Sequence, residues 1–151
     1  MESLTNVIIQ VTRQPGTNLV VLDVPGASIT AGQGLIIYLG DKRKSNQRWN
    51  FEPSGEDPYY FIVNQNSGLV LDAPRESSAQ VIQWNGQGND SQKWKLNPSD
   101  PALNSGDGHQ IINKQSSLVL DVQDGNLNDG TPVILYQAHD GTNQSWTFYD
   151  S

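Results

Sequence analysis

The sequence contains no cysteine, carries few positive charges and has no long hydrophobic run. Without cysteine, the chain can form no disulfide, no thiolate zinc site and no cysteine nucleophile. Lys and Arg number 9 against 16 Asp and Glu, which gives a net charge of -7. Nucleic acids and anionic membrane surfaces both attract basic patches, so the charge balance disfavours both as partners.

The hydrophobic segments are short. The longest are 19–22 and 35–39, far below the ~20 residues of a membrane helix. The first ten residues lack the basic region and the apolar stretch of a signal peptide. We therefore expect no membrane insertion, and either a cytoplasmic location or export by a route without a visible signal peptide.

Polar amides, aromatic residues and turn formers are abundant instead. The chain has 14 Asn, 14 Gln, 14 Gly, 8 Pro, 4 Trp and 5 Tyr, while hydrophobic residues make up 35%. This composition differs from the charge-rich composition of disordered chains and is typical of many short strands joined by turns. The length of 151 residues suits a single domain.

One pattern occurs three times along the chain. The strings LVVLDV, LVLDA and LVLDV place an aspartate at Asp23, Asp72 and Asp121, with a spacing of 49 residues each time. Each string is followed by an apolar run that ends in an aromatic residue, and then by a Q-x-W string. These features are, in order, Tyr38, Trp84 and Tyr136, followed by NQRW (46–49), SQKW (91–94) and NQSW (143–146).

Three units, approximately 1–53, 54–100 and 101–151, therefore span the whole sequence. Each unit predicts four short strands, which in the third lie at about 109–114, 117–122, 132–137 and 143–149. No segment shows a sustained helical spacing of apolar residues. Three units are too few to close a propeller, so we expect an all-β closed barrel of twelve strands with pseudo-threefold symmetry.

The repeated aspartate, aromatic and Q-x-W residues resemble the ricin-B-type (R-type) lectins. The resemblance covers the whole chain and implies a β-trefoil fold with up to three shallow sugar pockets and no metal or other cofactor. The chemistry of the residues fits a sugar. A carboxylate accepts hydrogen bonds from adjacent hydroxyls, an aromatic ring stacks on the C–H face, and an amide both donates and accepts.

The third unit has the full set of site residues that the resemblance implies. Asp121 stands at the aspartate position and Tyr136 at the stacking position. His139 and Asn143 supply polar contacts, and Gln144 supports the pocket. This combination is similar to the galactose or N-acetylgalactosamine version of the site, so we expect the strongest binding here.

The second unit keeps part of this set. Asp72 and Trp84 stand at the aspartate and aromatic positions, and Gln87 takes the place of His139. Ser91 replaces the amide. The segment from Asp72 to Trp84 is three residues shorter than its counterpart in the third unit, so we expect a pocket of different shape.

The first unit keeps Asp23, Tyr38 and Asn46. Asp41 falls at the place of His139, and the basic run 42–44 follows it. Such a run either blocks the pocket or favours an anionic sugar. The residue two before the aromatic is isoleucine in all three units, where many members of the family have glutamine.

Some residues have simpler interpretations. The tryptophans of the Q-x-W strings are expected in the core, and the repeated aspartates have an alternative role in satisfying turn amides. Glu52, Glu56 and Asp57 lie in a linker, so we favour a solvated loop over a catalytic acid pair. His109 and His139 lack metal-ligand spacing, and we expect neither a metal site nor an enzyme.

The sequence thus predicts a lectin that binds terminal galactose or N-acetylgalactosamine on glycoproteins or glycolipids. Two alternatives stay open, namely a module for a polysaccharide such as xylan and a trefoil scaffold for protein interaction or protease inhibition. A homodimer is also left open, since weak single pockets profit from avidity.

Overall fold

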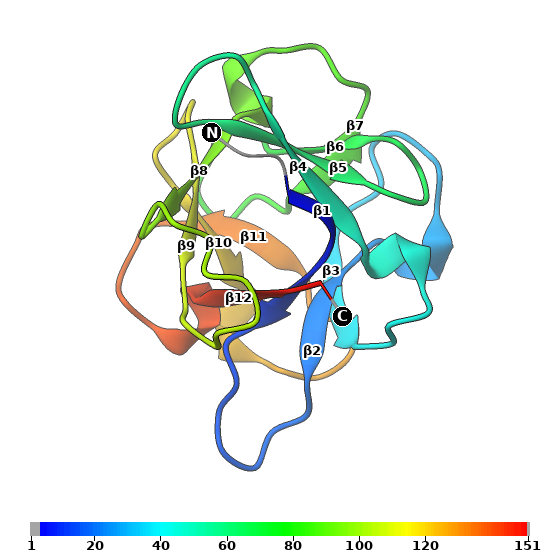
Figure 1. Ribbon diagram of the computed structural model, residues 1–151, viewed down its shortest axis with the longest axis vertical. Coiled ribbons are helices and arrows are strands. Elements are labelled where there is room, and N and C mark those ends of the chain that lie inside the picture. The colour runs from blue at the N-terminus through cyan, green and yellow to red at the C-terminus, as the bar shows by residue number, and fades with distance from the viewer. Residues whose placement is uncertain (1–3, 151) are drawn as a thin grey trace.

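The computed structural model describes residues 4–150 as an all-β fold with twelve strands, which confirms the predicted fold class and strand number (Figure 1). The strands are β1 (Leu4–Val11), β2 (Val20–Asp23), β3 (Ile36–Leu39), β4 (Trp49–Pro53), β5 (Tyr60–Asn64), β6 (Val70–Asp72), β7 (Ile82–Trp84), β8 (Trp94–Asn97), β9 (Gln110–Asn113), β10 (Val119–Val122), β11 (Val133–Tyr136) and β12 (Trp146–Tyr149). Five short 3-10 helices interrupt the loops: η1 (Pro25–Ala27), η2 (Ser45–Gln47), η3 (Asp90–Gln92), η4 (Gln123–Gly125) and η5 (Thr142–Gln144). No helix in this part of the chain is long and apolar enough to cross a membrane.

Six strands form a closed barrel. β1 pairs with β4, β4 with β5, β5 with β8, and β8 with β9, all antiparallel. β12 pairs with β1, and a bridge between His109 and Trp146 closes the ring between β9 and β12. A closed ring leaves no unpaired strand edge for aggregation.

The other six strands form three hairpins that meet at the threefold axis. They are β2–β3, β6–β7 and β10–β11. The backbone of Leu35 donates to Val81 O at 2.9 Å, Val81 donates to Val133 O at 3.0 Å, and Val133 donates back to Leu35 O at 3.0 Å. This cycle of hydrogen bonds joins one residue from each unit and fixes the symmetric arrangement of the hairpins.

The tryptophans of the Q-x-W strings lie in the core, as the sequence predicts. Trp49, Trp94 and Trp146 are each 0% exposed. Each indole Nε1 donates to the carbonyl oxygen of the leucine before a repeated aspartate, at 3.3, 3.1 and 3.2 Å in chain order. The bond satisfies the one polar atom of the buried ring and ties the barrel to the segment that carries the aspartate.

The last predicted strand of the third unit begins later than expected. Residues 143–145 were predicted as part of the strand, but Thr142–Gln144 forms the 3-10 helix η5 and the strand starts at Trp146. The backbone N–H of Gln144 bonds to Gly141 O and that of Ser145 to Thr142 O. This turn directs Asn143 and Gln144 back toward Asp121, so the local departure from strand geometry builds the pocket.

Candidate functional site

The glutamine of each Q-x-W string holds the aspartate of its own unit. Its Nε2 donates to the aspartate Oδ2 at 2.8 Å in the first unit, 3.0 Å in the second and 2.8 Å in the third. The pairs are Gln47–Asp23, Gln92–Asp72 and Gln144–Asp121. The three glutamine side chains are buried, so they position the carboxylates and do not contact a ligand themselves.

The same glutamine also fixes the loop that follows the aromatic residue. In the third unit, Gln144 Nε2 donates to Gln137 O at 2.9 Å, and Gln144 Oε1 accepts the backbone N–H of His139 at 2.9 Å. In the first unit, Asp41 N–H bonds to Gln47 Oε1 at 2.8 Å. One side chain therefore sets the distance between the carboxylate and the polar loop of its pocket.

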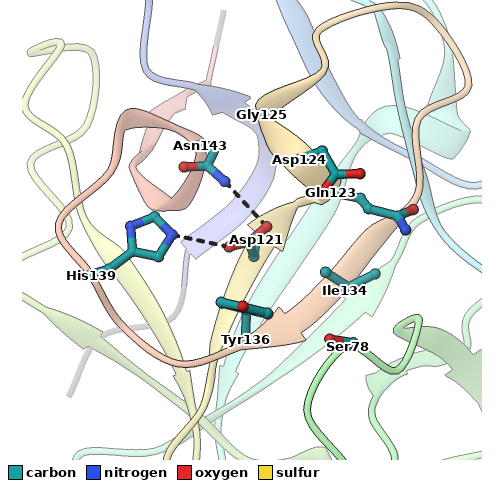
Figure 2. Close-up of a pocket in the computed structure, with 9 residues that line it drawn as sticks. All are labelled: Ser78, Asp121, Gln123, Asp124, Gly125, Ile134, Tyr136, His139 and Asn143. Carbon is teal, nitrogen blue, oxygen red and sulfur yellow. Dashed lines mark hydrogen bonds and ion pairs between the residues drawn. The ribbon is translucent and has the colours of Figure 1, made fainter.

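The third unit contains a depression of about 440 Å³ that gathers four of the five site residues predicted there (Figure 2). Asp121 lies at its centre, with Tyr136 below it, His139 on one side and Asn143 above in the view of Figure 2. The other lining residues are Ser78, Gln123, Asp124, Gly125 and Ile134. The Tyr136 side chain is accessible, since the residue is 41% exposed, and its ring provides an apolar surface beside the carboxylate.

Asp121 is almost fully buried, yet both carboxylate oxygens have donors. Asn143 Nδ2 donates to Oδ1 at 3.2 Å, and Gln144 Nε2 donates to Oδ2 at 2.8 Å. Burial raises the pKa of the Asp121 carboxyl, while the hydrogen bond from Gln144 and the charge of His139 act in the opposite direction. Each oxygen can accept a second hydrogen bond, so the carboxylate can receive two hydroxyls of a ligand.

His139 and Asn143 complete the polar side of this pocket. His139 Nδ1 accepts the backbone N–H of Gly141 at 3.1 Å, so the neutral ring carries its proton on Nε2, which lies 3.7 Å from Asp121 Oδ2. Asn143 Nδ2 donates to both Asp121 and Val122 O, and within residues 4–150 its Oδ1 accepts no hydrogen bond. The pocket thus offers one N–H donor and one free amide acceptor next to the carboxylate.

The first unit has a second depression, of about 460 Å³, with a related lining. Asp23, Tyr38 and Asn46 line it, as the sequence predicts, and Lys44 joins them. Asn46 Nδ2 donates to Val24 O at 3.0 Å, and Tyr38 is 40% exposed. Asp41, which was matched with His139 in the sequence, is not among the lining residues, because its carboxylate binds Arg43.

The second unit lacks a turn that lines the pockets of the first and third units. A 3-10 helix follows the aspartate in the first and third units (η1 and η4), whereas none follows Asp72. Asp72 Oδ1 instead accepts the backbone N–H of Ala73 at 2.7 Å. Trp84 is only partly exposed, and Gln87 is exposed and contributes its backbone N–H to Gln92 Oε1. The shorter segment between Asp72 and Trp84 predicted a pocket of different shape in the second unit. The missing 3-10 turn after Asp72 is the structural difference that the shorter segment produces.

Ile134, the isoleucine two before the aromatic that the sequence singles out, lines the pocket as the cross-strand partner of Asp121. Sequence reasoning named neither Gln123 nor Ser78 among the lining residues. Gln123 comes with Asp124 from the turn η4. Ser78 comes from the neighbouring unit, and no local pattern identifies it.

The acidic residues expected in a linker lie in two different settings. Glu52 is part of strand β4, whereas Glu56 binds Lys114 and its Oε1 lies 3.9 Å from Lys93 Nζ. Across residues 4–150, no cluster of three or more His, Asp or Glu side chains is arranged to hold a metal ion.

Comparison with known proteins identifies relatives of this architecture. The family described as "Ricin-type beta-trefoil lectin domain-like" matches residues 45–136 and 102–151. An agglutinin of Sclerotinia sclerotiorum is 29% identical over 113 residues, which cover 72% of each chain. The designed threefold-symmetric protein ThreeFoil is 32% identical with a TM-score of 0.81, covering 96% of this chain and 99% of its own. The ricin B-like lectin of Macrolepiota procera, solved in complex with lactose, is 20% identical with a TM-score of 0.73, covering 99% of this chain and 96% of its own.

Proposed function

Since the chain belongs to the ricin-type β-trefoil lectin family and is a carbohydrate-binding protein, we propose that its third unit binds terminal galactose or N-acetylgalactosamine. The observation that carries this proposal is the placement of the exposed Tyr136 ring beside the Asp121 carboxylate. A galactose-type sugar has an axial 4-hydroxyl and a largely apolar opposite face, so it can stack on the ring while its hydroxyls reach the carboxylate. The lactose complex of the Macrolepiota procera lectin supports a galactoside as ligand.

The other polar groups complete this mode of binding. A sugar hydroxyl can donate to Asn143 Oδ1, and His139 Nε2 can donate to a ligand oxygen. Two or three net hydrogen bonds of about 0.5–1.5 kcal/mol each and one stacking contact, reduced by the cost of ordering, correspond to a Kd of about 0.1–10 mM. The partners are then glycans on glycoproteins or glycolipids, and the protein recognises them without cleaving them.

A glycan array followed by one substitution tests this function. We expect signal on terminal galactose or N-acetylgalactosamine, and Tyr136→Ala should abolish it while the melting temperature changes little, because the ring is exposed. Tyr59→Ala, which removes a tyrosine outside the pockets, is the matched control and should keep the signal. Retention on xylan alone, or inhibition of a protease by a protein silent on the array, would contradict the proposal and select one of the two alternatives.

A further inference from the structure

The first and third pockets have the same backbone conformation after the aspartate, but the charges of their lining side chains differ. In both, the aspartate is followed by a turn with two successive residues at positive φ. These are Asp124 (φ 55) and Gly125 (φ 65) in the third unit, and Gly26 (φ 62) and Ala27 (φ 52) in the first. The same turn thus presents a carboxylate over the third pocket and no functional side chain over the first.

A lysine lines the first pocket from the loop between Tyr38 and Asn46, which is one residue longer than the corresponding loop of the third unit. The backbone of Asp41 occupies the place of His139, since each donates its N–H to the glutamine of the Q-x-W string. The Asp41 side chain turns away and binds Arg43 through Oδ1 and Oδ2 at 3.1 Å. The extra residue brings Lys44 to the pocket lining, where the third unit has a histidine.

Within residues 4–150, Lys44 is the cation of this loop that both lines the pocket and lacks an ion-pair partner, since the likewise unpaired Lys42 lines a different depression. Arg43 is paired with Asp41, and Arg48 donates to the carbonyl oxygens of Asn6 and Lys42 at 2.9 and 3.1 Å. Lys44 Nζ lies 5.6 Å from the centre of the Tyr38 ring, and within residues 4–150 it has no hydrogen-bond acceptor or carboxylate in contact. A cation over an aromatic ring at the edge of a pocket is poised to meet an anionic group of a stacked ligand.

The balance of charges differs between the two pockets. Two aspartates and no lysine or arginine line the third pocket, whereas one aspartate and one lysine line the first. Burial raises the pKa of the Asp23 carboxyl, the hydrogen bond from Gln47 and the charge of Lys44 lower it, and Asp129 raises it. Asp129 is the remaining acid near this site, and its Oδ1 is held by the backbone N–H of Leu39 at 2.9 Å.

We propose that the first pocket binds an acidic sugar, a galactose-type ring that carries a carboxylate or sulfate group, with the anion on Lys44 Nζ. The ring stacks on Tyr38, and its hydroxyls bond to Asp23 and to the amide of Asn46. The third pocket excludes the same ligand through Asp121 and Asp124. This inference rests on the proposed function, and it assigns the two pockets to different classes of sugar.

Calorimetric titration with the third pocket silenced tests the assignment. In the Tyr136→Ala protein, galacturonic acid and galactose sulfates should bind roughly tenfold more tightly than methyl galactoside, and high salt should reduce the difference. Adding Lys44→Gln should weaken the anionic ligands by about three- to tenfold. Lys42→Gln is the matched control, since this neighbouring lysine lines a different depression, and it should change nothing.

The outcomes separate the two proposals. Equal or tighter binding of methyl galactoside by the Tyr136→Ala protein, or undiminished anion binding after Lys44→Gln, would overturn the acidic-sugar assignment. The two anionic probes distinguish a carboxylate from a sulfate ligand. If methyl galactoside still binds wild-type protein in those cases, the lectin function of the third pocket stands. Failure of the wild-type protein to bind any galactoside would instead overturn the proposed function.

Discussion

At the scale of the residue, the Asp121 carboxylate is buried, yet each of its oxygens can accept one more hydrogen bond. The residue is 3% exposed, and burial is the main cause that raises the pKa of its carboxyl. Asn143 and Gln144 offset part of the desolvation cost by donating to the two oxygens. A carboxylate that is held in place but incompletely satisfied is well suited to accept hydroxyls from a ligand.

The raised pKa of Asp121 predicts acid release of the ligand without unfolding. As the pH falls, the carboxyl takes up a proton at a pH above the ordinary aspartate value of about 3.9, and it then loses its charge-assisted hydrogen bonds to the sugar. Protonation of a carboxyl with a raised pKa favours the folded state, so binding should decline while the fold persists.

Galactoside titrations from pH 7 to pH 4, with circular dichroism at each pH, measure both properties. The decline should persist in His139→Gln, because this variant removes the imidazole and leaves Asp121. Constant affinity down to pH 4, or loss of structure together with binding, would contradict the assignment of the acid-sensitive group to Asp121.

The predictability of the site differs from residue to residue. Asp121, Tyr136 and Asn143 line one pocket, as predicted. Their spacing from the Q-x-W string was enough to predict this placement. Lys44 could not be placed from spacing, because the ion pair of Asp41 with Arg43 decides which side chain of the longer loop faces the pocket. For Gln87, sugar contact stays a prediction: its side chain is exposed, and its backbone N–H bonds to Gln92 Oε1.

At the scale of the element, the 3-10 helix before the last barrel strand of each unit (β4, β8 and β12) is the feature that repeats. η2, η3 and η5 each carry the glutamine that bonds to the aspartate of a hairpin strand. The alternation of apolar residues predicted the strands, but it gave no sign of these helices, because a turn of three residues has no periodicity. The strand boundary near residue 143 was therefore the least accurate part of the prediction.

Substitution of this glutamine should separate pocket geometry from overall folding. Gln144→Ala removes the bonds to Asp121, Gln137 and His139, and three bonds of about 0.5–1.5 kcal/mol each predict a loss of roughly 1.5–4.5 kcal/mol in the free energy of unfolding. Galactoside binding in the third pocket should weaken at least about tenfold, because the loop that carries His139 loses its anchor.

Gln92→Ala is the matched control for this experiment. It breaks the equivalent bonds of the second unit, to Asp72, Asn85 and Gln87, and should destabilise the protein by a similar amount. The affinity for galactoside should nevertheless stay within about twofold of the wild-type value. Equal weakening by both substitutions would show that stability, and not the local anchor, governs binding.

At the scale of the whole molecule, the closed fold holds pockets of different character in one rigid frame. The cycle of backbone bonds through Leu35, Val81 and Val133 couples the three hairpins, and the first and third units share the bridge between Ile36 and Pro132. The threefold pattern of the sequence predicted this frame, since each unit repeats the same core residues. The charges of the pockets do not follow the threefold symmetry, because the turn and loop residues that determine these charges differ between the units.

This rigid frame predicts that a surface coated with both neutral and acidic galactose-type sugars binds the protein more strongly than a surface coated with either sugar alone. With a neutral and an acidic pocket on one chain, the second contact forms at an effective concentration near the millimolar range. A mixed surface should therefore retain the protein about tenfold more strongly than a neutral or acidic surface of equal density. Biosensor measurements on the three surfaces test this, and Lys44→Gln should reduce retention on the mixed surface to that on the neutral one. A homodimer would behave differently, because its two identical third pockets would raise retention on the neutral surface as well; equal retention on the neutral and mixed surfaces would thus assign the avidity to subunit pairing.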